Sequence, residues 1–176
     1  MLHYTGPLTT ALCQMITDKF QKVFELEEHN EFENAFALLS ELAGKGYGLA
    51  LLEMASRYHS PESYAKDIYP KSPDKRLSEE YASKAFKALH NESLIGNGES
   101  MRMLAYTYLG LSLPFYEKDL SVGEDLLLKA FEAGCYVAAN DLSTFYLGKD
   151  IEKAKFWYKQ ADIHNCRVIY NAECET

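Results

Sequence analysis

One phrase recurs three times along this chain with its internal spacing intact: a glycine followed, at four-residue steps, by a small residue, an apolar residue and a tyrosine. Residues four apart lie one above the other on an α-helix, so each copy predicts one packing stripe. The copies begin 50 and 38 residues apart, a period typical of stacked helical repeats. The phrase therefore predicts an all-α chain of repeated helix pairs. The copies are Gly46-Ala50-Met54-Tyr58, Gly96-Ser100-Leu104-Tyr108 and Gly134-Ala138-Leu142-Tyr146.

Apolar periodicity and the glycines divide the 176 residues into about four helix pairs within a single domain, 1–176. Each pair has an apolar stripe that it can bury only on its neighbour, which predicts a stack. The expected parts are a divergent first pair at 9–45, repeats at about 46–90, 96–133 and 134–165, and a C-terminal cap at 166–176.

Three second helices are expected to start at capping motifs, where a side-chain oxygen accepts a hydrogen bond from the free amides of the first turn. Proline directly after such a residue also favours a helix start, because its missing N–H is not needed there. The motifs are Asn30 with Glu33, Ser72-Pro73, and Ser121 with Glu124.

The last pair carries residues by which a known family is identified. Its stretch Ala138-xxx-Leu142-xx-Phe145-Tyr146-x-Gly148-x-Asp150-xx-Lys153-Ala154-xx-Trp157-Tyr158-xx-Ala161 resembles the Sel-one-like repeat, a relative of the tetratricopeptide repeat. The likeness extends over about residues 46–165, although the third pair has Gly123 where the pattern has alanine. The resemblance implies a right-handed α-solenoid of antiparallel helix pairs whose first helices line a concave side.

Helix geometry predicts which side chains look into that concave side. If Ala50, Ser100 and Ala138 point into the stack, the residues one before, two after and six after each face the groove. Arg102 and Tyr106 are the types most often found among residues that dominate binding energy. The expected partner-binding face is Leu49, Leu52, Ser56, Glu99, Arg102, Tyr106, Val137, Asn140 and Thr144.

Aromatic residues in the two long connections are further candidates for partner contact. Tyr64, Tyr69, Phe115 and Tyr116 lie outside the repeat positions, and long connections are often functional. Tyrosine combines a large rigid surface with a polar tip, which suits a binding surface. Local packing is the alternative reading of these residues.

Charge narrows the class of partner. The formal net charge is −8 and the pI is about 5.1, which disfavours nucleic acid and anionic membrane surfaces and favours a partner with a basic surface. Solubility alone is the competing explanation of the charge. With no signal sequence and no run of eighteen apolar residues, a cytoplasmic location is expected.

No catalytic, metal or cofactor site is expected. The four cysteines form no CxxC pair, and the five histidines form no HxxxH pair. No serine lies in a GxSxG turn, and no glycine-rich segment has the pattern of a phosphate-binding loop.

The expected function is therefore binding of a protein, not catalysis. Within the resemblance, a short bacterial member without a catalytic domain looks like an immunity protein that neutralises a toxin. A regulatory or assembly adaptor and a secreted effector are the alternatives, and an enzyme is the less favoured one. Dimerisation through an incompletely covered terminal face is also expected.

Overall fold

The computed structural model of the protein describes residues 7–61, 67–70, 72–112, 116–167 and 174, with the backbone alone for residues 7–17. Within those residues the chain forms eight α-helices and no strand, which confirms the expected all-α class. The chain divides into two compact units, unit 1 over Met1–Gly96 and unit 2 over Asn97–Thr176, each with its own hydrophobic cluster.

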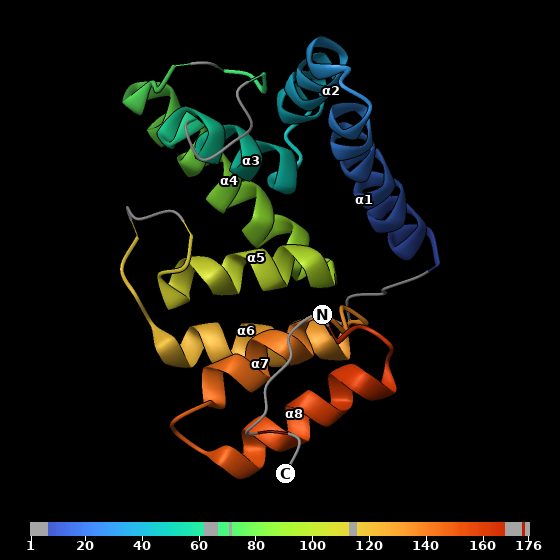
Figure 1. The fold of residues 1–176 in the computed structure, drawn as a ribbon, viewed down its shortest axis with the longest axis vertical. Helices are drawn as coiled ribbons and strands as arrows, with labels where there is room; N and C mark the ends of the chain where they lie inside the picture. The colour runs from blue at the N-terminus through green and yellow to red at the C-terminus, as the bar shows by residue number, and fades with distance from the viewer. Residues whose placement is uncertain (1–6, 62–66, 71, 113–115, 168–173, 175–176) are drawn as a thin grey trace. The chain divides into compact units, whose positions relative to one another are not determined.

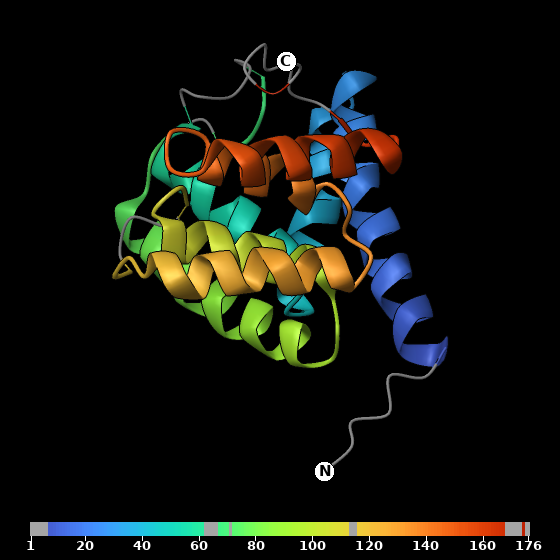
Figure 2. The same ribbon diagram turned by 90° about the horizontal axis from the view of Figure 1, so that it is seen from below.

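Each unit contains two consecutive helix pairs (Figure 1). In both units every helix packs against the next one along the chain, and Figure 2 shows α5 and α6 lying side by side along their length. The continuation of these pairs into one right-handed solenoid stays a prediction. Unit 1 holds α1 (Pro7–Glu28), α2 (Phe32–Gly44), α3 (Gly48–His59) and α4 (Lys75–Leu94). Unit 2 holds α5 (Gly98–Leu109), α6 (Leu120–Glu132), α7 (Ala138–Tyr146) and α8 (Ile151–Ile163).

The repeated phrase supplies the packing stripe of α3, α5 and α7, as its spacing predicts. Its small and apolar members are all buried. The glycine of each copy ends the preceding helix with a positive φ of 83°, 90° or 91°, a conformation that costs other residues energy because of their Cβ. The buried members are Ala50, Ser100 and Ala138, then Met54, Leu104 and Leu142.

The tyrosine of each copy is joined to an aspartate that starts the second helix of the pair. The backbone N–H groups of Asp74, Asp119 and Asp150 donate to the carbonyl oxygens of Tyr58, Tyr108 and Tyr146, each at 2.9 Å. All three aspartates have an extended backbone, and their side chains accept hydrogen bonds from first-turn amides. The same turn chemistry therefore closes three helix pairs.

These aspartates overturn the expected capping motifs. Helix α4 begins after Asp74 and α6 after Asp119, so neither Ser72 nor Ser121 is the cap. The aspartates are favoured because their backbone N–H groups also bond the tyrosine carbonyls, which holds each carboxylate at its helix start.

The first expected motif is wrong for a different reason. Asn30 has a left-handed φ of 62°, and its N–H bonds the carbonyl of Glu27, so it belongs to the turn that ends α1. Helix α2 starts instead after Glu31, which makes no side-chain cap.

A small residue lies four positions after each capping aspartate: Ser78, Gly123 and Ala154. In two pairs a serine hydroxyl crosses between helices: Ser78 Oγ donates to the carbonyl of Ala55 at 2.9 Å, and Ser143 Oγ to that of Ala154 at 3.0 Å. A Cβ at Gly123 would lie 2.6 Å from Leu109 Cδ2. The Leu109 side chain thus fills the space that a methyl group at position 123 would need. This explains why Gly123 stands where the Sel-one-like pattern has alanine.

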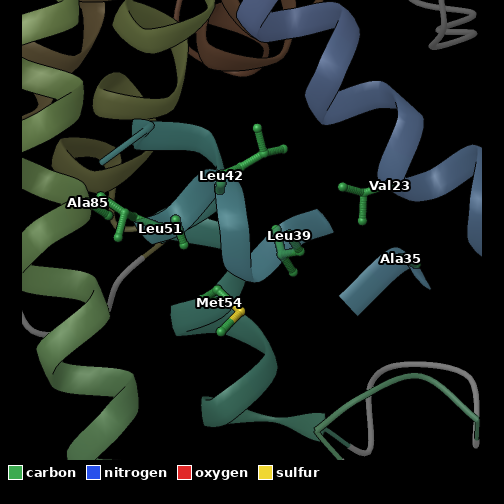
Figure 3. Packing of buried hydrophobic residues seen from close by; sticks show 9 residues of the cluster. Val23, Ala35, Leu39, Leu42, Leu51, Met54 and Ala85 are labelled. Atoms are coloured by element: carbon green, nitrogen blue, oxygen red, sulfur yellow. The ribbon is translucent and has the colours of Figure 1, made fainter. Parts of the chain in front are cut away.

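Each unit has a cluster of buried apolar side chains. Figure 3 shows the cluster of unit 1, to which α1, α2, α3 and α4 all contribute. In unit 2 the cluster includes Cys174, so part of the expected C-terminal cap packs against this core. The unit 1 cluster includes Val23, Ala35, Leu39, Leu42, Leu51, Met54 and Ala85, and the unit 2 cluster includes Ala105, Leu127, Ala130, Leu142 and Tyr158.

Replacing Asp119 with alanine is expected to lower the free energy of unfolding by about 0.5–2 kcal/mol, because two amides lose their acceptor. Asp119→Asn is the matched control and should retain most of the stability, since asparagine caps helices about as well. Urea unfolding followed by Trp157 fluorescence reports on unit 2, where the single tryptophan lies. Equal loss in both variants would contradict the capping role.

Candidate functional site

A network of polar side chains joins α5 to α7 in unit 2. Arg102 Nε donates to Asp141 Oδ2 at 2.5 Å, and Arg102 Nη2 donates to the Tyr106 hydroxyl at 2.6 Å. That hydroxyl in turn donates to Asp141 Oδ1 at 2.6 Å. Arg102 Nη1 donates to Glu99 Oε1 at 3.1 Å. The four side chains form one connected set. This set joins α5 to α7, which are the first helices of the two pairs in unit 2.

The network is largely withdrawn from solvent, with side-chain exposures of 17% for Arg102 and 13% for Asp141. Burial alone would lower the pKa of the Arg102 guanidinium, but the hydrogen bond and the charge of Asp141 outweigh it and raise that pKa. Burial, together with Asp141, also raises the pKa of the Tyr106 phenol. The arginine stays charged and the phenol stays protonated, so both remain hydrogen-bond donors.

Sequence reasoning placed Glu99, Arg102 and Tyr106 on one face, and the structure brings them together. It did not identify Asp141, the residue that binds two of them. The signal available was an acidic residue beside the expected groove position Asn140. Because Arg102 and Tyr106 serve this internal network, a partner would meet them only at the edge of their side chains.

Three residues of the expected binding face, Val137, Asn140 and Thr144, lie at the start of α7 or within it, and they differ in exposure. Asn140 is buried and donates to the carbonyls of Val137 at 3.2 Å and Cys166 at 2.9 Å. Val137 is half-buried, whereas Thr144 is exposed. Of the three, Thr144 is the most exposed, and it lines the same hollow as Tyr106.

This hollow of unit 2 has a volume of about 510 Å³, within the range of about 300–1,000 Å³ found for ligand sites. Of the nine described residues that line it, five are apolar, and these come from α5, α6, α7 and the turns that follow α5 and α7. The lining is Tyr106, Leu109, Leu111, Leu120, Asp141, Thr144, Phe145, Leu147 and Lys149.

Two leucines that line this hollow are exposed to solvent: Leu111 has 70% and Leu120 has 52% of its surface exposed. Leu111 follows the left-handed Gly110 at the end of α5, and Leu120 is the first residue of α6. Sequence reasoning passed over both because it followed helix stripes. The signal that could have found them is an apolar residue on either side of a turn.

In unit 1 the expected face is uneven. Leu49 is buried, and half-buried Leu52 packs against the core, so neither presents a full apolar surface. Ser56 is exposed. The residues Leu49, Leu52 and Ser56 are therefore not equivalent in what they offer a partner.

The aromatic residues of the connections are only partly described. Tyr64 and Phe115 lie outside the described residues, and Tyr116 is half-buried. The Tyr69 ring lies 5.8 Å from that of Phe36, so local packing accounts for part of its surface. Tyr69 also borders a hollow of about 410 Å³ in unit 1, and the charged residues among its described lining are Glu31, Glu33 and Asp67.

A second charged network lies in unit 1 around Arg57, whose side chain is 1% exposed. Its Nη1 donates to Glu27 Oε1 at 2.7 Å and its Nε to Glu53 Oε1 at 2.8 Å. Burial alone would lower the pKa of Arg57, but the two carboxylates outweigh it and raise that pKa. Glu27 lies in the last turn of α1, so this ion pair joins α1 to α3.

The Cys135 thiol is held in its protonated form. Its Sγ donates to Glu99 Oε2 at 3.1 Å, and burial, followed by the charge of Glu99, raises the pKa of the thiol to about 12. A thiol with this pKa carries very little thiolate at neutral pH.

Iodoacetamide at pH 8 should therefore alkylate Cys135 at least about 100-fold more slowly in the folded protein than in urea, because the thiolate is the reacting form. Peptide mapping by mass spectrometry measures each cysteine separately, and the urea-unfolded chain is the internal control. Similar rates in the two states would show that the thiol is neither buried nor paired as described.

Other kinds of site lack support in the described part of the chain. No group of three or more histidine, cysteine or acidic side chains there is arranged to hold a metal ion. None of the described helices combines the length and apolarity needed to cross a membrane. Comparisons of the chain with protein-family models, curated proteins and solved structures give no match.

Proposed function

We propose that this protein is a non-enzymatic interaction module and that the hollow of unit 2 holds a segment of a protein partner. The observation that carries the proposal is the pair of exposed leucines, Leu111 and Leu120, beside a preformed apolar hollow. Apolar surface gathered around a concavity is typical of interaction sites. Burying one leucine side chain contributes about 1.5–3 kcal/mol to association before the entropic costs of binding.

The internal network supports this use of the hollow. Arg102, Tyr106 and Asp141 hold α5 to α7, and Tyr106 and Asp141 also line the hollow. A site held in shape before binding loses less conformational entropy when a partner arrives. The network thus contributes rigidity, and the leucines contribute contact area.

Repeat equivalence supports the proposal that the chain is a Sel-one-like, right-handed solenoid. Three pairs share the glycine turn, the aspartate cap and the bond from aspartate to tyrosine. They also share a fully buried alanine eleven residues after the cap: Ala85, Ala130 and Ala161. We propose that a cytoplasmic bacterial protein of this kind neutralises a toxin as an immunity protein, with a regulatory adaptor as the second role.

The proposal is tested by affinity capture from a lysate of the native host. A double variant, Leu111→Ser with Leu120→Ser, removes the exposed apolar surface at the hollow. The matched control is Phe156→Ser with Ile163→Ser, which removes comparably exposed residues from α8. A protein recovered in about equal amount with the wild type and the control, but not with the hollow variant, supports the proposal.

The identity of the captured protein separates the two roles. A toxin whose activity is blocked by the wild type and not by the hollow variant would establish an immunity protein. A pathway component would favour an adaptor. Equal recovery with all three proteins would overturn the hollow as the binding site.

A further inference from the structure

Resting on that proposed function, we infer that the segment held by the hollow carries a bulky apolar side chain flanked by an acidic residue. The apolar side chain is expected because five lining residues are leucine or phenylalanine. The acidic neighbour is expected from the charges at the rim. The chain as a whole is acidic, so this local preference runs against its net charge of −8.

Lys149 is the exposed cation that lines the hollow. Its Nζ lies 3.5 Å from the centroid of the Phe145 ring, which is also part of the lining. The ammonium group of Lys149 therefore contacts the apolar lining of the hollow at Phe145. A partner side chain packed against Phe145 would bring its sequence neighbours within reach of this charge.

Lys118 is a second exposed cation, on the connection between α5 and α6. Its side chain lies across Gly110, where a Cβ would come within 2.7 Å of Nζ. Gly110 lies between Leu109 and Leu111, both of which line the hollow. Lys149 thus supplies a positive charge at the hollow itself, and Lys118 supplies one close to Gly110, the neighbour in sequence of two lining leucines.

The nearby aspartates are already engaged within the protein. Both carboxylate oxygens of Asp141 accept hydrogen bonds from Arg102 and Tyr106. Asp119 and Asp150 accept from the first-turn amides of α6 and α8. The partial positive charge at the starts of α6 and α8 offsets part of the charge of Asp119 and Asp150. Lys149, which lines the hollow, is then the residue placed to attract a negative charge there.

Selection from a random dodecapeptide library displayed on phage tests this chemistry without assuming a sequence. The immobilised full chain is the target, and Thr144→Trp, which fills the hollow from α7, is the counter-selection. Retention of the wild-type circular dichroism and urea midpoint shows that the filled variant is folded. Enriched peptides should carry leucine or phenylalanine with aspartate or glutamate within about one helical turn.

Two results of this selection would overturn the inference. One is enrichment of peptides with lysine or arginine beside the apolar residue, or with no charge preference. The other is failure to enrich any peptide over the filled variant, which would leave the hollow to a small apolar molecule or to no ligand.

A charge exchange tests the lysine directly. Lys149→Glu should weaken binding of the dye-labelled consensus peptide about threefold or more and strengthen binding of its aspartate-to-lysine counterpart, measured by fluorescence anisotropy. Lys159→Glu, an exposed lysine of α8 outside the hollow, is the control and should change neither affinity. The effect should shrink between 50 and 500 mM NaCl.

The two proposals fail in different ways. If Leu111→Ser with Leu120→Ser abolishes capture of the protein partner while Lys149→Glu alters neither partner nor peptide binding, the interaction module stands and the acidic preference is wrong. If neither variant affects capture, both proposals are wrong.

Discussion

Replacing Arg57 with alanine is expected to lower the free energy of unfolding by about 3–5 kcal/mol, the range for removing one member of a buried ion network. Arg57 is 1% exposed, and its loss would leave Glu27 and Glu53 without their shared cation in a poorly solvated site. Urea denaturation followed by far-ultraviolet circular dichroism measures the change.

Two comparisons separate this effect from a general sensitivity of the protein. Arg76→Ala removes an exposed arginine from α4 and should leave the unfolding midpoint unchanged. A triple variant, Arg57→Met with Glu27→Leu and Glu53→Leu, replaces the whole network by apolar side chains and should recover much of the lost stability. A triple variant no more stable than Arg57→Ala would show that lost packing, not unpaired charge, causes the effect.

Replacing Leu142 with alanine is expected to cost about 2–5 kcal/mol, because the truncated side chain leaves a cavity that its neighbours fill only in part. Leu142 is fully buried and belongs to the cluster of unit 2. Trp157 lies on α8, and its ring centroid is 5.1 Å from that of Phe131. Its fluorescence therefore reports on the same unit.

Leu111→Ala is the matched control for this variant, because it is the same chemical change at a position that is 70% exposed. It should change the free energy of unfolding by less than about 0.5 kcal/mol. A comparable loss in both variants would mean that the stripe of α7 is wrongly assigned. The same control also checks that altering the hollow for binding experiments leaves the fold intact.

The packing stripes could be read from the sequence because they depend on spacing alone. Ala138 and Leu142 are four residues apart, so any α-helix through them places both on one face. The turn glycines were readable for a similar reason, since a left-handed position strongly favours glycine. Such local signals do not depend on which residues pack against the helix in the folded protein.

The sequence predicted the starts of α4 and α6 incorrectly, because several residues near each start could cap the helix. Ser72 and Asp74 both have suitable side chains, and the choice depends on the bond from the Asp74 N–H to the carbonyl of Tyr58. That bond joins residues sixteen positions apart, on either side of the connection between α3 and α4. Spacing within the second helix carries no information about it.

The candidate site shows the same division. The sequence by itself determined that Glu99, Arg102 and Tyr106 share one face of a helix and that the glycine phrases mark packing stripes, because both follow from helical periodicity. Only the tertiary structure decided that Asp141 binds Arg102, that Glu27 reaches Arg57, and that Leu111 and Leu120 border one hollow. The two ion pairs join residues 39 and 30 positions apart, and the hollow is lined by residues of three helices, so all of these features exist only once the helices pack.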